Sequence, residues 1–187
     1  MKRITPILGV LVLCSGIMLA QNAPSSQQEQ LSFEIGHHTP VVKHPVSLSD
    51  AELVALRNST PAEQGLEGLV SNKPALSIPK PTREGLEAAV VHLNGPAERD
   101  LVVIGSGRRY AAGTAPYWIL APFWVIREEN GKPKIVLAIF TQQLQILSSK
   151  HRGMADLTAR KDTGMGTLVT QFEFNGFKYT EGISISN

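Results

Sequence analysis

The clearest pattern in the chain is an alternation of apolar and polar residues over Thr167–Ile183, interrupted at Asn175-Gly176. Asn-Gly between two alternating runs favours a two-residue type I′ turn, because both central residues then adopt positive φ at little cost. That turn would set aromatic residues opposite one another on one face, as the pairs Phe174–Phe177 and Phe172–Tyr179. The pattern therefore predicts an antiparallel hairpin whose four aromatic rings pack in the core rather than stack on a ligand.

A second hairpin is predicted around Asn130-Gly131, between the runs Tyr117–Arg127 and Lys134–Phe140. A two-residue turn would pair Trp124 with Leu137. Both faces of this hairpin are apolar, so we expect it to lie centrally in the fold, covered by the N-terminal helices. Pro122 is expected to produce a bulge or to mark an edge strand.

Three shorter apolar runs complete the predicted strands, at Leu86–Leu93, Leu101–Ile104 and Leu144–Leu147. The run at Leu101–Ile104 has no polar residue, as expected of a strand buried on both faces. Helical signals occur only before these runs. Ser49–Glu52 and Thr60–Glu63 both match the capping box that starts a helix.

These elements predict an α+β fold that is mainly β. We expect one or two short N-terminal helices and an antiparallel sheet of hairpins, arranged as a blade or a meander. The sheet should contain about six to eight strands.

Two parts of the chain follow the same order of features. Asp100-Leu101 begins a strand, and a glycine-rich loop, an aromatic strand and the Asn130-Gly131 turn follow. Asp156-Leu157 begins the same order, which ends at Asn175-Gly176. The order predicts two related units, at about residues 86–148 and 150–187, within one domain spanning residues 47–187. The alternative is that Asp-Leu and Asn-Gly recur by chance in a β-rich chain.

Two segments carry a resemblance to known proteins. Leu93-Asn94-Gly95 followed by Arg99–Val103 resembles the core of FG-GAP or VCBS-type repeats. Gly153–Leu157 together with Phe172–Tyr179 is similar to small exported bacterial proteins of uncharacterised function. The resemblance implies an exported β-unit. The Asp-x-Asp-x-Asp-Gly calcium loop is absent, so no metal site is expected.

The N-terminus has the features of a secretory signal peptide. Lys2 and Arg3 precede the apolar run Ile7–Ala20, and the segment after it is polar. We expect residues 1–20 to be a signal peptide cleaved after Ala20, and residues 21–46 to be a disordered or extended tether. Cys14 raises a lipoprotein alternative, which the large residue before it disfavours. The expected location is the periplasm or the extracellular space.

Charge and cysteine content narrow the possible functions. The chain of 187 residues has 18 basic and 16 acidic residues, and loss of Lys2 and Arg3 would leave 16 of each. A neutral chain gives no basis for binding nucleic acid. Cys14 is the only cysteine and would leave with the signal peptide, so no thiol or disulfide chemistry is expected. No membrane span is expected after cleavage.

The most promising ligand site in the sequence is the glycine-containing loop Gly105–Pro116, which carries Arg108, Arg109 and Tyr110 after a buried strand. Guanidinium groups and a tyrosine suit recognition of carboxylate, phosphate or sugar. The alternative is a loop whose arginines only keep it soluble. Three histidines (His37, His38 and His44) could bind a transition metal, but no carboxylate or cysteine accompanies them at a fixed spacing.

No complete set of catalytic residues and no cofactor motif is found, so the sequence favours a non-catalytic exported module. Its expected partner is an envelope protein or an anionic or saccharide ligand, bound by Arg108–Tyr110 and exposed parts of Tyr117–Trp124. Two alternatives stay open. One is a hydrolase that uses Asp100 and Asp156 as paired carboxylates, and the other is a purely structural envelope protein.

Overall fold

The computed structural model describes residues 29–35, 41–59, 81–105, 108–109, 119–163 and 166–186. Its elements are β1 (Ser32–Glu34), α1 (Asp50–Arg57), a short 3₁₀ turn (Arg83–Gly85), β2 (Leu86–Val91), β3 (Asp100–Gly105), β4 (Arg108–Arg109), β5 (Ile119–Glu129), β6 (Lys132–Thr141), β7 (Gln143–His151), β8 (Met154–Thr163), β9 (Gly166–Phe174) and β10 (Tyr179–Ser186). The predicted class, α+β and mainly β with antiparallel pairing, is confirmed.

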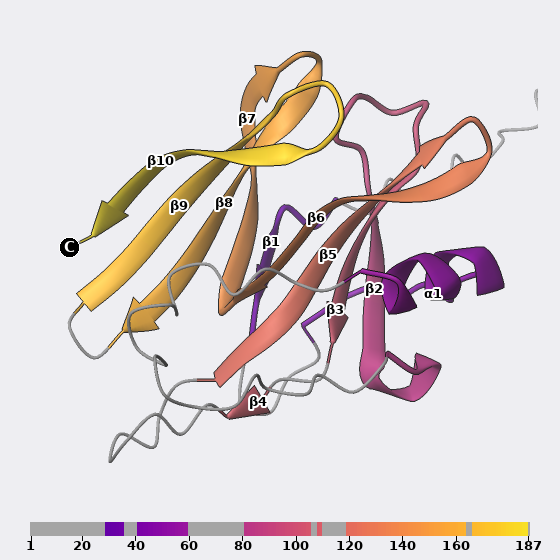
Figure 1. Ribbon diagram of the computed structural model, residues 1–187, viewed down its shortest axis with the longest axis horizontal. Coiled ribbons are helices and arrows are strands. Elements are labelled where there is room, and N and C mark those ends of the chain that lie inside the picture. The colour runs from indigo at the N-terminus through magenta and orange to yellow at the C-terminus, as the bar shows by residue number, and fades with distance from the viewer. Residues whose placement is uncertain are drawn as a thin grey trace, which may run out of the picture.

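The strands form two antiparallel sheets rather than one (Figure 1). The first sheet has the order β1-β7-β8-β9-β10. The second has the order β2-β3-β5, with β6 and the short β4 also paired to β5. Each sheet thus contains a meander of four long strands, β7-β8-β9-β10 in one and β2-β3-β5-β6 in the other. The change of sheet occurs at Gln142, so β7 belongs to the meander β7-β8-β9-β10 rather than to the unit predicted for residues 86–148.

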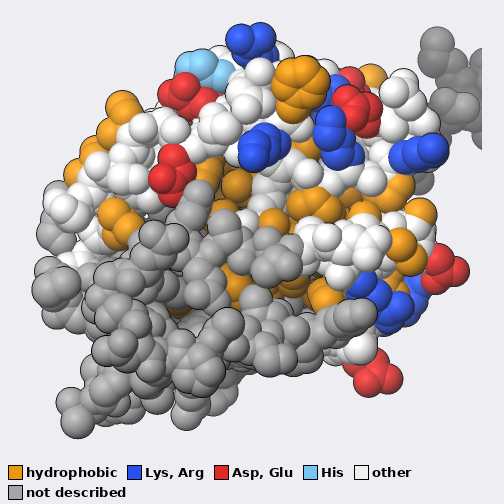
Figure 2. Space-filling model, viewed as in Figure 1, with side chains coloured by type: hydrophobic (Ala, Val, Ile, Leu, Met, Phe, Trp, Pro, Cys, Tyr) orange, Lys and Arg blue, Asp and Glu red, His pale blue; other side chains and the backbone are white. Residues whose placement is uncertain are grey.

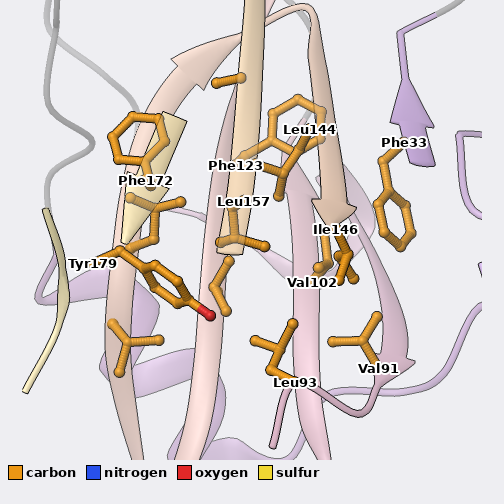
Figure 3. Packing of buried hydrophobic residues seen from close by; sticks show 14 of the residues in the cluster. Phe33, Val91, Leu93, Val102, Phe123, Leu144, Ile146, Leu157, Phe172 and Tyr179 are labelled. Atoms are coloured by element: carbon orange, nitrogen blue, oxygen red, sulfur yellow. The ribbon is translucent and has the colours of Figure 1, made fainter. Parts of the chain in front are cut away.

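Apolar side chains from both sheets meet in a shared core (Figure 3). Val102 and Phe123 of the second sheet lie in one cluster with Leu157 and Phe172 of the first. The opposite face of the second sheet is covered by α1, where Leu56 packs with Trp124 in a separate cluster. The β5–β6 hairpin is therefore buried on both faces, as its sequence predicts.

The start of α1 is a capping box. Ser49 Oγ accepts a hydrogen bond from the Glu52 amide at 3.2 Å, and Glu52 Oε2 accepts one from the Ser49 amide at 2.6 Å. Two of the amides that a helix start leaves without partners are thereby satisfied. The sequence prediction of a helix beginning here is confirmed.

Replacing Ser49 with alanine is expected to lower the free energy of unfolding by about 1 kcal/mol, the usual contribution of an N-cap side chain. Urea denaturation of the wild type and variant measures the difference. Ser47→Ala is the matched control, because Ser47 is exposed and lies just before the helix. Equal losses for the two variants would contradict a capping role.

The β5–β6 hairpin has the predicted two-residue turn. Asn130 and Gly131 have φ of 54° and 71°, and Glu129 pairs with Lys132. The predicted pairing of Trp124 with Leu137 is wrong by one residue, because a bulge at Val136 leaves Trp124 opposite Ala138. Pro122 is not at an edge, since β5 has neighbours on both sides.

The β9–β10 hairpin differs from its prediction. Tyr179 pairs with Phe174 and Glu181 with Phe172, so residues 175–178 form a four-residue connection. The predicted two-residue turn is wrong, and so is its register. The shift is two residues, so Phe172 and Tyr179 still face the core.

The N-terminal segment is part of the fold rather than a tether. Phe33 of β1 pairs with Leu144 and is fully buried, and Val42 is buried in the same core. The predicted tether at residues 21–46 is therefore wrong for these residues, whose apolar side chains fill the open edge of the core. The predicted helix at Thr60–Glu63 lies outside the described residues.

Candidate functional site

Three turns lie toward the same end of the two sheets: Asn130-Gly131 between β5 and β6, Arg152-Gly153 between β7 and β8, and Asn175–Lys178 between β9 and β10. The β9–β10 turn contacts one side chain from each of the other two hairpins, Lys134 of β6 and Arg152. Lys134 Nζ lies 5.7 Å from the centre of the Phe177 ring. We call this end the three-turn surface, and it consists of residues 130–131, 134, 152–153 and 175–178. Figure 2 shows Lys and Arg side chains in the upper part of the molecule, with Asp and Glu side chains among them.

The β9–β10 turn is held by the side chain of Asn175. Its Oδ1 accepts hydrogen bonds from the amides of Phe177 at 2.9 Å and Lys178 at 3.0 Å, and its own amide donates to the Lys178 carbonyl at 3.0 Å. Asparagine side chains commonly stabilise turns in this way. Gly176 takes φ of +105°, which suits glycine. The backbone of the turn is thus fixed by local hydrogen bonds.

Phe177 is exposed at the tip of this turn, with 73% of its surface accessible. The prediction that the four aromatic rings of this hairpin are all core residues is wrong for Phe177 and correct for Phe172, Phe174 and Tyr179, which are buried. The reason is the longer connection, which places residue 177 in the loop instead of in β10.

The β7–β8 turn presents Arg152. It has φ of 50°, one of two positive-φ residues other than glycine in the described part of the chain. Arg152 lies against the neighbouring turn, since a Cβ built on Gly176 would be 3.7 Å from Arg152 Cδ and 3.8 Å from Nη1. Among the described residues, neither Arg152 nor Lys178 makes an ion pair.

A buried chain of hydrogen bonds joins β10 and β8 of the first sheet to the β2–β3 connection of the second. The Tyr179 hydroxyl donates to the Ala155 carbonyl at 2.6 Å, and the Ala155 amide donates to the Leu93 carbonyl at 2.8 Å. The Leu93 amide donates to Asp100 Oδ2 at 3.0 Å. Buried polar groups gain most when each is paired in this way.

Asp100 is fully buried, and burial raises the pKa of its carboxyl group, against the lowering effects of the Leu93 amide and of Arg127. Arg127 follows Ile126, the residue that pairs with Leu101, so Asp100 and Arg127 face each other across β3 and β5. The Arg127 guanidinium also lies 3.4 Å from Glu98 and 5.8 Å from the centre of the Phe174 ring. The charge of Asp100 is thus partly balanced inside the fold.

Asp156 is also fully buried. Its side-chain hydrogen bond is with His151 and not with Asp100. His151 Nδ1 lies 2.7 Å from Asp156 Oδ1, and Nε2 lies 3.5 Å from Glu173 Oε2. The hydrogen bond with Asp156 raises the pKa of His151, and the charge of Glu173 adds to it. Burial raises the pKa of Tyr179, and the charges of Asp100 and Asp156 raise it further.

The loop predicted to bind ligand lies elsewhere. Arg108 and Arg109 form β4, which pairs with Leu120 and Ile119 at the opposite end of β5 from Asn130. Eleven residues of strand separate these ends, roughly 35 Å at about 3.3 Å per residue. Tyr110 lies outside the described residues. Trp124, proposed as part of an exposed aromatic surface, is buried under α1.

The predicted histidine candidates do not form a metal site in the described part of the chain. His37 and His38 lie outside it. His44 lines a groove of about 290 Å³ with His92 and Glu29. No group of three His, Cys, Asp or Glu side chains is placed to hold a metal ion among the residues that the structure describes. Nor is any described helix long and apolar enough to cross a membrane.

The sequence pattern does not predict the role of Arg152, and it predicts a buried position for Phe177, which is exposed. A signal for the first was available, because Arg152-Gly153 separates two strand-like runs just as Asn130-Gly131 does. No comparable signal existed for Phe177, whose exposure depends on the length of the turn. No known protein family, curated protein or solved structure matches this chain.

Proposed function

We propose that this chain is an exported, non-catalytic binding module whose binding site is the three-turn surface. The observation that carries the proposal is the exposure of Phe177 on a turn fixed by three hydrogen bonds, beside Lys134, Arg152 and Lys178. The positive N-terminal residues and the apolar run after them support export.

An exposed aromatic ring on a rigid turn is well suited to binding. A ring carried on a fixed backbone turn costs little backbone entropy when it contacts a partner, and it offers a large apolar area. Aromatic and arginine side chains contribute most to binding energy in many interfaces. The buried network beneath the turns keeps these groups in place on both sheets.

The charges on this surface favour an anionic partner. Lys134 is paired with Glu129 at 2.6 Å, whereas Arg152 and Lys178 have no acidic partner among the described residues. Unpaired cations beside an aromatic ring attract an anionic ligand and orient it. A ligand of the cell envelope that carries negative charge, whether or not it is a saccharide, fits this arrangement better than a neutral ligand.

The alternative of a hydrolase is not favoured by the positions of the two aspartates. Asp100 and Asp156 are each 0% exposed, and their hydrogen bonds go to Leu93 and His151. A carboxylate that acts on a substrate must reach it or a bound water. We infer that both aspartates position the strands and turns of this end.

We further propose that the two meanders derive from one duplicated unit related to FG-GAP or VCBS-type repeats. The topology supports this: Asp100 and Asp156 lie on the second strand of each meander, and both Asn-Gly pairs lie between the third and fourth strands.

Phe177→Ala is expected to reduce the amount of protein bound to purified bacterial cell envelopes at least fivefold, because it removes the exposed ring at the centre of the surface. Co-sedimentation at several protein concentrations measures binding. Ile185→Ala is the matched control, since Ile185 is 56% exposed on β10 and lies outside the three-turn surface. Equal binding by the two variants would refute this location.

A further inference from the structure

The β7–β8 turn and the β5–β6 turn have the same backbone geometry but different first residues. Asn130 and Gly131 have φ of 54° and 71°, and Arg152 and Gly153 have φ of 50° and 85°. Asparagine adopts this left-handed conformation readily, whereas a long side chain adopts it rarely. The turn would form more easily with asparagine at position 152. A residue held against its local preference marks a position where the side chain itself is needed.

The Arg152 side chain is directed along the neighbouring turn. Gly176 has no Cβ, and the Arg152 stem and guanidinium lie within 4 Å of the point where one would be. This contact places the guanidinium against Gly176, the residue that precedes Phe177 in the turn. The acidic groups nearby are engaged elsewhere, because Asp156 and Glu173 contact His151 and Glu129 contacts Lys134.

A guanidinium that makes no ion pair among the described residues, and that lies against the turn carrying an exposed aromatic ring, matches one ligand chemistry closely. Guanidinium binds a carboxylate through two parallel hydrogen bonds, and an aromatic ring packs on the apolar C–H face of a sugar. A uronic acid carries both features on a single pyranose ring. Single-stranded nucleic acid also combines charge and stacking, but it needs a series of rings along a basic groove. Phe177 is the one exposed aromatic residue in the described part of the chain.

We propose that the three-turn surface binds uronic acid units of an acidic polysaccharide, with Arg152 pairing to the carboxylate and Phe177 packing on the sugar ring. This inference rests on the proposed function and names its ligand class. Lys178, which makes no ion pair among the described residues, supplies further positive charge for the neighbouring units of the polymer. Arg152 is the residue that distinguishes an acidic sugar from a neutral one.

The test uses galacturonate oligomers and the same oligomers with every carboxyl group methyl-esterified, so that only the charge differs. Titration calorimetry in 150 mM salt compares wild type, Arg152→Asn, Phe177→Ala and Ile185→Ala. The wild type is expected to bind the acid form at least tenfold more tightly than the ester. Arg152→Asn should weaken binding of the acid form at least tenfold and leave binding of the ester unchanged. Its melting temperature should equal or exceed that of the wild type, which excludes unfolding as the cause.

Several outcomes overturn the inference. Equal binding of the acid and ester forms would show that Arg152 does not pair with the carboxylate. An Arg152→Asn variant that binds like the wild type would show the same. Equally tight binding of inorganic polyphosphate or of a single-stranded DNA oligomer shows that charge or general stacking suffices. If Phe177→Ala alone weakens binding to cell envelopes, the surface is right and the ligand class is wrong. If neither substitution changes any binding, the proposed function also fails.

Discussion

Replacing Phe33 with alanine is expected to lower the free energy of unfolding by about 3–4 kcal/mol, the lower part of the range for removing a large aromatic side chain from a core. Phe33 is fully buried in the cluster that contains Leu144 and Ile146 (Figure 3). β1 is a short strand at the edge of its sheet, so partial closure of the cavity keeps the expected loss at the lower end. Urea unfolding followed by fluorescence measures it.

Leu31→Ala is the matched control for Phe33→Ala. Leu31 lies two residues earlier and is 51% exposed, so its truncation should change stability by less than about 0.5 kcal/mol. If the two variants have the same stability, residues 31–35 do not pack on the sheets in solution, and the tether predicted from the sequence would be the correct description.

Two substitutions of Asp100 are expected to separate the contribution of its hydrogen bond to stability from the contribution of its charge. Asp100→Ala removes the acceptor for the buried Leu93 amide and should lower stability by about 2–3 kcal/mol. Asp100→Asn retains an acceptor oxygen of nearly the same size, so its cost at neutral pH should be less than half of this. Urea unfolding at pH 7 compares the two variants with the wild type.

The pH dependence of the same variants tests the direction of the pKa shift. Burial raises the pKa of folded Asp100 above its ordinary value of 3.8, so the folded state binds the proton more tightly than the unfolded state. The protonated carboxyl of Asp100 therefore adds to the free energy of unfolding. This contribution is complete below pH 3.8 and is lost as the pH rises through the pKa of the folded state. Asp100→Asn cannot lose it, so the variant should gain stability relative to the wild type between about pH 4 and 7. A relative loss over this range would show that the folded protein favours the ionised carboxylate.

Much of the fold follows from local patterns. The capping box at Ser49 and Glu52 specifies the start of α1, because it satisfies helix amides within a few residues of the chain. The uninterrupted apolar run Leu101–Ile104 specifies a strand with both faces covered, and in the structure all of its side chains are buried. The division into two sheets has no local signal, because it depends on which strands pair after the tight connection at Gln142.

The candidate site was less predictable. The sequence favours Arg108 and Arg109 because they follow a buried strand and a glycine, which are local features. Arg152 and Phe177 come together only because two hairpins of the first sheet end beside each other, at the end where β5 and β6 of the second sheet also turn. Proximity between turns that are far apart in the chain cannot be derived from spacing alone.

The hairpin at Asn175-Gly176 has one feature that the local sequence determines, its buried face, and one that only the tertiary structure determines, its register. Alternation determined that Phe172, Phe174 and Tyr179 share a buried face, because side chains in a strand repeat every two residues. It could not distinguish two registers that differ by two residues, since both bury the same face. The tertiary structure made that choice. The Tyr179 hydroxyl binds the Ala155 carbonyl and its ring packs edge-on against Phe174 at 5.5 Å, which sets these two residues opposite each other. The turn must then contain four residues, and Phe177 becomes exposed.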